Sequence, residues 1–249
     1  MFESFKKNRR ATALLTCVTA ALLSHASLSH ASLTLSATRV IYGSDKRSVS
    51  LVVANPSDKV FAVQSWVNTS ADDTTTVVPF MASPPLFRIQ PGKKQQVQIN
   101  GLPNTLPNDR ESLFYFNAQE IPQVGTDQSN VLNIAIRTRI KFFYRPAQLK
   151  ENPSERLKDL QWSLQQIDGK PKLIVNNPTP FHYTFQRLEV SGAGRSKRLD
   201  NPAMAAPFSR EVYALADLSL GPNPQVSFTT INDYGGITEP ITLPIQPGR

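Results

Sequence analysis

The chain has 249 residues, with 27 lysines and arginines against 19 aspartates and glutamates, and a formal net charge of +8 at pH 7. This mildly basic balance, without a zinc-ligand spacing, an RNA-binding signature or a basic helix, argues against a nucleic-acid-binding module. One cysteine and three histidines are present in the whole sequence, which excludes a disulfide framework and His-rich zinc sites.

The first 31 residues have the features of an export signal that is removed from the mature protein. Four cations between residues 6 and 10 form a basic start, and the apolar run 11–23 is too short to span a bilayer as a stable helix. Cleavage is expected after Ala31, although Ser-His-Ala at 24–26 is a competing site. We therefore expect an exported protein whose mature chain is not inserted in a membrane.

Removal of this leader leaves few chemically reactive side chains. Cys17, His25 and His30 leave with it, together with four of the 27 cations and one of the 19 anions, so the mature net charge is +5. His182, in the run "PFHYTF", is interpreted as an ordinary surface or core histidine, and no catalytic triad with another histidine is available. No phosphate-binding glycine loop occurs. We predict no enzyme, cofactor or metal, although sequence alone leaves open a glycosidase-type carboxylate pair.

Short runs of alternating apolar and polar residues dominate the mature chain, which is typical of an all-β sandwich. Turn signals such as "PGKK" at 91–94 and "LGPNP" at 220–224 separate these runs, and sustained helical periodicity is absent. The clearest predicted strands lie within residues 48–55, 59–67, 95–100, 111–121, 172–178 and 225–232.

Two features divide the mature chain near residue 150. The stretch "RPAQLKENPSER" at 145–156 is polar and flanked by prolines, as domain linkers often are. A weak repeat spans it, because "LVVANPSDKVFAVQSW" at 51–66 and "LIVNNPTPFHYTFQRL" at 173–188 share a strand, an Asn-Pro turn and a second strand. We predict two sandwich domains, residues 32–150 and 151–249, each large enough to bury its own core.

The last predicted strand before this linker, "NVLNIAIRTRIKFFYRP" at 130–146, is apolar at one end and cationic at the other. In one interpretation, Leu132, Ile134 and Ile136 face the core of their own sandwich. In the other, the strand lies at a sheet edge, where unpaired backbone groups invite a strand from a partner.

A second unusual feature is Arg39, which falls on the apolar face of the predicted strand 33–42. Either the strand kinks and the guanidinium reaches water, or the cation is held for an anion, because a partly buried charge without a partner is costly. The spacing alone favours neither interpretation.

Five segments in this order resemble the periplasmic chaperones of the chaperone–usher pilus pathway. They are "TRVIY" (38–42), "PPLFRIQPG" (84–92), "DRESLFYFNAQEIP" (109–122), "NVLNIAIRTRIKFFYRP" (130–146) and "INDYGG" (231–236). The resemblance implies two immunoglobulin-like domains set at an angle with a cleft between them, a location in the periplasm, and no catalysis. It also implies binding to pilus subunits and delivery to an outer-membrane usher, and leaves open whether the free protein associates with itself.

The resemblance further implies roles for eight residues. A donor strand that fills the open core of a subunit would use Leu132, Ile134 and Ile136. Binding of the subunit's C-terminal carboxylate would use Arg39 and Lys141. A charged network that fixes the two domains would use Glu111, Arg145 and Asp233.

The sequence departs from this family pattern in one respect, since a family disulfide in the second domain is missing. The loop from Pro122 to Asn130 is short, as in the subclass that serves rod-like pili. The competing hypothesis is a fimbrial subunit or adhesin. Such a chain should carry an alternating apolar N-terminal extension for donation, whereas here the candidate donor is internal.

Overall fold

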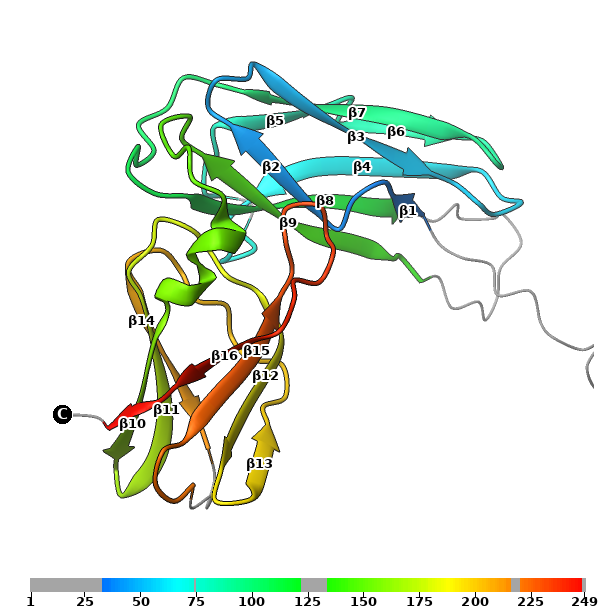
Figure 1. Ribbon diagram of the computed structural model, residues 1–249. Helices are drawn as coiled ribbons and strands as arrows, with labels where there is room; N and C mark the ends of the chain where they lie inside the picture. Colours follow the sequence, from blue (N-terminus) through cyan, green and yellow to red (C-terminus); the bar gives the residue numbers. More distant parts are fainter. Residues whose placement is uncertain (1–32, 74, 122–133, 216–219, 248–249) are drawn as a thin grey trace, which may run out of the picture. The chain divides into compact units, whose positions relative to one another are not determined.

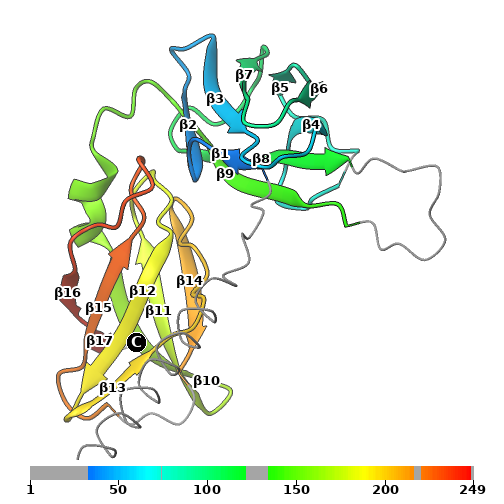
Figure 2. The ribbon, with the colours of Figure 1, turned by 90° about the vertical axis from the view of Figure 1, so that its right-hand side faces the viewer.

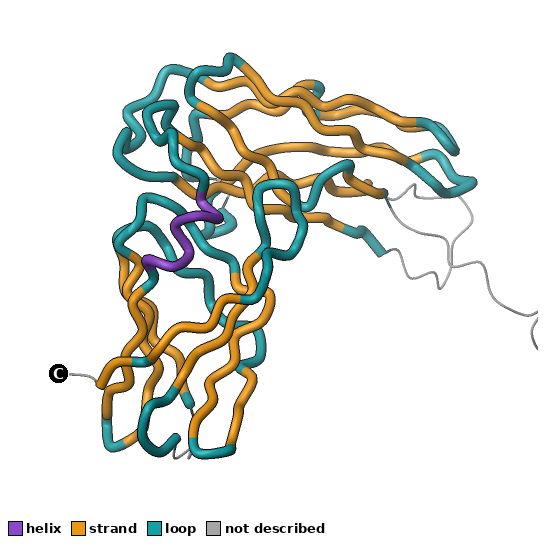
Figure 3. The backbone as a smooth tube through the Cα atoms, viewed as in Figure 1, coloured by secondary structure: helices purple, strands orange, loops and turns teal. Residues whose placement is uncertain are grey.

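The structure is a computed structural model that describes residues 33–73, 75–121, 134–215 and 220–247. The predicted leader, the loop 122–130 and Leu132 lie outside these residues. Figure 3 shows the described chain as strands and loops with one short helical segment. The predicted all-β class with two sandwich domains is confirmed, and each of the six clearest predicted strand runs contains a strand.

The first sandwich consists of two sheets with the strand orders β1-β3-β7-β5 and β2-β9-β8-β4-β6 (Figure 1). The strands are β1 (Thr34–Leu35), β2 (Arg39–Gly43), β3 (Ser48–Ala54), β4 (Phe61–Asn68), β5 (Phe80–Ser83), β6 (Leu86–Ile89), β7 (Lys94–Gly101), β8 (Ser112–Ile121) and β9 (Arg137–Arg145). Alternate residues of these strands turn inward and bury a core that includes Val53, Val63, Ile99, Phe116 and Phe142.

The second sandwich follows a short 3-10 helix, η1 (Pro153–Asp159), and pairs the sheets β14-β11-β10-β17 and β13-β12-β15-β16. Its strands are β10 (Gln161–Ile167), β11 (Lys170–Asn177), β12 (Phe185–Gly192), β13 (Arg195–Arg198), β14 (Ser209–Ala214), β15 (Gln225–Thr230), β16 (Ile241–Pro244) and β17 (Gln246–Pro247). Trp162 packs against Phe185 and Phe228 in its core, with ring centroids 5.6 and 5.4 Å away. Aromatic packing therefore fills the core of a domain whose sequence contains no cysteine.

The weak sequence repeat corresponds to one turn that is built twice. Asn55 donates from Nδ2 to the carbonyl of Lys59 at 2.6 Å, and its Oδ1 accepts from the backbone and hydroxyl of Ser57. Asn177 likewise donates to the carbonyl of Phe181 at 2.8 Å and accepts from both donors of Thr179. The Asn-Pro-Ser/Thr sequence thus satisfies the buried polar groups of the turn in both sandwiches.

The predicted strand over residues 33–42 is divided between the two sheets. Ser36 donates its backbone N–H to Val52, after which the chain crosses to the opposite layer and pairs in parallel with β9. Val40 and Tyr42 then turn into the core, so Arg39 lies on the face away from it. The prediction that Arg39 interrupts the core face of one continuous strand is therefore wrong, because the crossing resets the alternation.

Strand β9 extends beyond its neighbour β2 at its N-terminal end. Residues 137–144 pair with β8 in antiparallel register, whereas β2 pairs only with residues 141–145. Figure 2 shows the N-terminal part of β9 continuing beyond β2. Along residues 137–140 no second described strand pairs with this edge. We call residues 134–140 the open edge.

Candidate functional site

Two isoleucines of the open edge are exposed to solvent. Ile134 is 65 % exposed and Ile136 is 44 % exposed, although they continue the alternation of Ile140 and Phe142, which pack in the core. The backbone carbonyl of Ile136 still accepts a hydrogen bond from Glu120 at 2.9 Å, so the ladder with β8 extends to this residue. The interpretation in which Ile134 and Ile136 face the core of their own sandwich is therefore wrong.

The backbone of the open edge presents hydrogen-bonding groups on its unpaired side. The backbone of Ile136 is hydrogen-bonded to β8, and the direction of the backbone N–H and C=O groups alternates along a strand. The backbone groups of even-numbered residues of β9 therefore face β8, and those of odd-numbered residues face the opposite side. The carbonyl of Arg145 accordingly accepts from Ser44, directly after β2. Ala135, Arg137 and Arg139 therefore direct their N–H and C=O groups toward the open side, where another strand can add.

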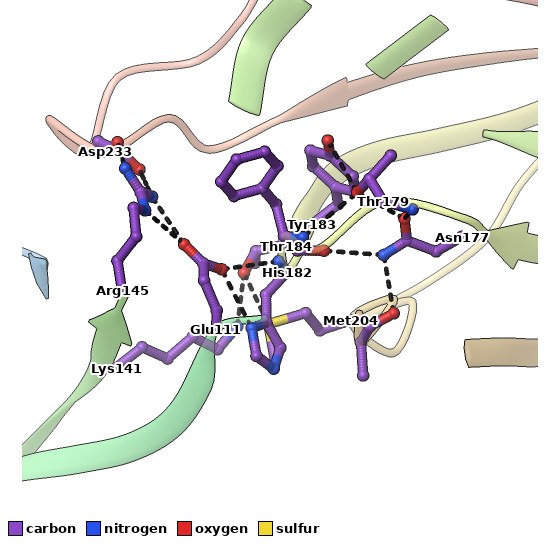
Figure 4. Close-up of polar contacts among 12 residues, drawn as sticks. Glu111, Lys141, Arg145, Asn177, Thr179, His182, Tyr183, Thr184, Met204 and Asp233 are labelled. Carbon is purple, nitrogen blue, oxygen red and sulfur yellow. Dashed lines mark hydrogen bonds and ion pairs between the residues drawn. The ribbon is translucent and has the colours of Figure 1, made fainter. Parts of the chain in front are cut away.

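Arg39 and Lys141 are brought side by side by the parallel pairing of β2 with β9, in which they are direct partners. Arg39 is buried, donates from Nη1 to the carbonyl of Ile231 at 2.7 Å, and lies 5.7 Å from the ring centroid of Phe143. Its Nε finds no hydrogen-bond partner among the described residues. Lys141 donates from Nζ to the hydroxyl of Thr184 at 2.9 Å (Figure 4).

This pair of cations is electrostatically unfavourable without an anion. Burial lowers the pKa of Arg39, although the carboxylates of Asp233 and Glu111 oppose this effect. Burial, with repulsion from Arg39 as a second cause, lowers the pKa of Lys141 to about 8. An anion between the two side chains would relieve the repulsion and use the free donor of Arg39.

Glu111, Arg145 and Asp233 form one network, although they are far apart in the sequence. Arg145 donates from Nε to Glu111 at 2.8 Å and makes a two-pronged contact with Asp233 at 2.6 and 2.8 Å. Burial alone would lower the pKa of Arg145, but hydrogen bonds and charges from Asp233 and Glu111 raise it above its ordinary value. Figure 4 shows this arrangement, in which the first sandwich supplies Glu111 and Arg145 and the second supplies Asp233.

His182 is a member of this network that the sequence interpretation did not assign. Its backbone N–H donates to the second carboxylate oxygen of Glu111 at 2.8 Å, and its Nδ1 lies 3.1 Å from the same oxygen. The ring is buried against Phe143, with centroids 5.3 Å apart. Glu111 is itself only 4 % exposed. The aromatic run around His182 left a surface and a core position both open, and nothing in the sequence indicated its partner.

A cavity of about 20 Å³ lies beside this network, and it is lined by Arg39, by the network residues and by the segment 231–233. Its volume is enough for about one water molecule. Within the described ranges, no three His, Cys, Asp or Glu side chains are placed to hold a metal ion. In the same part of the chain, no helix has the length and apolar character needed to cross a membrane.

Two family models match the chain in succession. Residues 32–150 match the PapD N-terminal domain of pili and flagellar-assembly chaperones. Residues 155–242 match the C-terminal domain of the pili assembly chaperone PapD.

Curated relatives cover most of the chain. The probable fimbrial chaperone YadV of Escherichia coli K12 is 39 % identical over 241 residues, which are 93 % of this chain and 97 % of that protein. The chaperone protein PapD of Escherichia coli is 34 % identical over 209 residues, which are 83 % of this chain and 84 % of that protein.

Solved structures have the same fold. The YadV chaperone crystal structure matches with a TM-score of 0.73 and 38 % identity, covering 85 % of this chain and 99 % of that one. A chain from the complex of the Salmonella enterica SafA pilin with the SafB chaperone matches with a TM-score of 0.72 and 28 % identity, covering 86 % and 96 %.

Proposed function

This chain belongs to the PapD family of pilus-assembly chaperones, and from that premise we propose that it binds pilus subunits by lending them the open edge of β9. A subunit whose own sheet lacks a strand would pair its backbone with Ala135, Arg137 and Arg139. This is the donor-strand form of β-augmentation. The observation that carries the proposal is the exposure of Ile134 and Ile136 beside an edge with which no second strand of the described residues pairs.

Apolar side chains supply most of the proposed affinity. Full burial of a leucine or isoleucine side chain is worth about 1.5–3 kcal/mol, so Leu132, Ile134 and Ile136 together would contribute about 5–9 kcal/mol before ordering costs. Because Ile134 and Ile136 are already partly covered, the gain lies toward the lower end. The alternation of side chains along a strand would fill successive pockets of a subunit groove.

Arg39 and Lys141 set the register of the added strand in this proposal. They would bind the C-terminal carboxylate of the subunit through charge-assisted hydrogen bonds, each worth about 1.5–3 kcal/mol. A slip of one residue would turn every inserted side chain to the wrong face. Fixing the end of the subunit prevents that slip.

The network of Glu111, Arg145 and Asp233, with His182, holds the two sandwiches in a fixed relation in this proposal. With domain boundaries at residues 32–150 and 151–249, which are part of this proposal, Glu111 and Arg145 belong to the first domain and Asp233 to the second. The protein would work in the periplasm after removal of its leader, hand subunits to an outer-membrane usher, and carry out no catalysis.

The proposal is tested by co-expressing the full chain with a cognate pilus subunit. We expect Ile134→Asp and Lys141→Ala to fold normally and to abolish recovery of subunit from the periplasm. Val212, which is 42 % exposed on β14 of the second sandwich, offers a matched control, because Val212→Asp adds the same charge on the other domain. Normal subunit levels with both test variants would overturn the proposal.

A further inference from the structure

Two arginine side chains of the open edge pack on the face of the sheet that points away from the core. Arg137 and Arg139 extend from this face over the neighbouring strands β8 and β4. The guanidinium of Arg137 lies 5.4 Å from the ring centroid of Trp66, and that of Arg139 lies 3.8 Å from the ring centroid of Tyr115. Both cations are therefore stacked on aromatic rings of the same sheet.

A turn at residues 69–72, directly after β4, completes this contact. The carbonyl of Thr69 accepts from Nη2 of Arg139 at 2.7 Å. The carboxylate of Asp72 accepts from Nη2 of Arg137 and lies 3.7 Å from Nε of Arg139. One carboxylate thus contacts both arginines of the open edge. We call Asp72, Arg137 and Arg139 the outer brace.

Polar residues of β4 and β8 fix the outer brace in turn. Asn117 accepts from Nε of Arg137 at 3.0 Å and donates to Asn68 at 3.0 Å. Asn68 donates to Asp72 at 2.7 Å. Asp72 adopts a left-handed backbone conformation with a φ of 59°, which a residue other than glycine takes at some cost. These contacts hold the carboxylate between the two arginines.

The outer brace lies on the part of β9 that β2 does not pair with. Among the strands that the structure describes, residues 137–140 pair with β8 alone, and Arg137 and Arg139 are the residues whose backbone groups face the open side. A strand with one paired side frays more readily than a central strand. Ordering it before a partner arrives reduces the entropy lost on binding.

We propose that Asp72 is a positioning residue, which keeps the open edge extended in the free protein by holding Arg137 and Arg139 against the sheet. The inference rests on the proposed function for its effect on subunit capture, but the ordering of the edge is measurable without a subunit. Asp72 is 38 % exposed and its arginine partners are 29 and 26 % exposed. Such pairs contribute little to global stability, so the effect is local.

Asp72→Asn is the informative variant. Asparagine tolerates the left-handed conformation and still accepts from Asn68, so only the charge is removed. The neighbouring Asp73 bonds Thr75 and Thr76 in its own turn, which makes Asp73→Asn a matched control. Hydrogen exchange is followed in the full free chain at the amides of Thr138 and Ile140, which face β8.

We expect exchange at these two amides to be about threefold to tenfold faster in Asp72→Asn, with an unchanged melting temperature, and unchanged in Asp73→Asn. The rate of subunit capture should fall by a similar factor. Unchanged exchange or unchanged capture in Asp72→Asn would overturn the inference. Ile134→Asp, measured in parallel, separates the hypotheses, because normal capture by that variant contradicts the proposed function itself.

Discussion

Lys141 is a residue of the candidate site whose pKa lies far from its ordinary value. Burial and the charge of Arg39 lower its pKa from 10.5 to about 8. Below about pH 8 the amine is charged in both the folded and the unfolded chain, and burial of that charge lowers the free energy of unfolding. The free energy of unfolding should therefore rise between about pH 8 and pH 10.5, as the folded state loses this proton first.

The same shift predicts how subunit binding depends on pH. A carboxylate beside Lys141 favours the charged amine, so above about pH 8 binding must take up a proton. We expect affinity for a purified pilus subunit to be level near pH 7 and to fall by at most about tenfold per pH unit above pH 8. Calorimetric titration in buffers of different ionisation enthalpy measures both the affinity and the proton uptake.

Lys141→Arg is the control for this prediction, because arginine stays charged across the range. Its affinity for the subunit should not change between about pH 7 and pH 9.5. An equal decline in both proteins would assign the pH dependence to another group, and Lys141 would then have no part in it.

Arg39 shows which features of a single residue the sequence pattern could predict and which it could not. The position of Arg39 on a strand was visible from alternation, but its face was predicted wrongly because the chain changes sheets between Leu35 and Arg39. Its pairing with Lys141 depends on a parallel contact across about 100 residues of sequence. No local pattern encodes that contact, and only the family resemblance placed the two residues together.

At the scale of elements, the strand pattern was largely predictable and the edge was not. Alternating Val, Ile and Phe residues indicated β3, β4, β7, β8, β11 and β15 because one face of each strand is buried. The Asn-Pro repeat likewise gave the same turn in both sandwiches. However, Ile134 and Ile136 have the alternation of a buried strand, and alternation alone shows neither that β2 pairs only from Lys141 onward nor that both side chains are exposed.

The backbone of the open edge can be tested separately from its side chains. Ala135 is exposed and directs its N–H away from β8. Ala135→Pro removes this donor, keeps Ile134 extended and leaves the ladder with β8 intact. We expect subunit capture to weaken by about fivefold to tenfold, the value of one net hydrogen bond with some steric hindrance.

Ala135→Ser keeps the N–H at nearly the same size and serves as the control. Competition between each variant and the unmodified chaperone for one subunit, followed by separation of the complexes, gives the ratio of affinities. If Ala135→Pro competes as well as Ala135→Ser, the subunit does not pair with this edge, and the side chains alone carry the binding.

At the scale of the whole molecule, Arg145 is one of several residues that connect the two sandwiches. Arg145 ends β9, whose opposite end is the open edge, and it contacts Glu111 of the first sandwich and Asp233 of the second. The partners are 34 and 88 residues away in the sequence. Composition and periodicity cannot predict such a network, and one of the two contacts of His182 with it is a backbone N–H that every residue type except proline would supply.

Arg145→Met tests whether this network couples the two domains. The variant keeps an apolar stem of similar length but leaves Glu111 buried without its cation, a loss worth about 3–5 kcal/mol for a fully buried pair. Because Arg145 and Asp233 retain side-chain exposures of 16 and 32 %, the loss should lie at or below the lower end of that range. We expect calorimetry to give a single unfolding transition for the unmodified protein and two for Arg145→Met, with the first sandwich melting earlier.

Arg156→Met is the matched control, since Arg156 pairs with Glu151 and Asp159 in and beside η1 with 30 % side-chain exposure. Its melting profile should stay single and shift little, as is usual for exposed ion pairs. A single transition at lower temperature for Arg145→Met would mean that the network stabilises the fold without being the link between the sandwiches. Two transitions would mean that the cation at one end of the lent strand also holds the domains together, so that capture and domain geometry depend on the same strand.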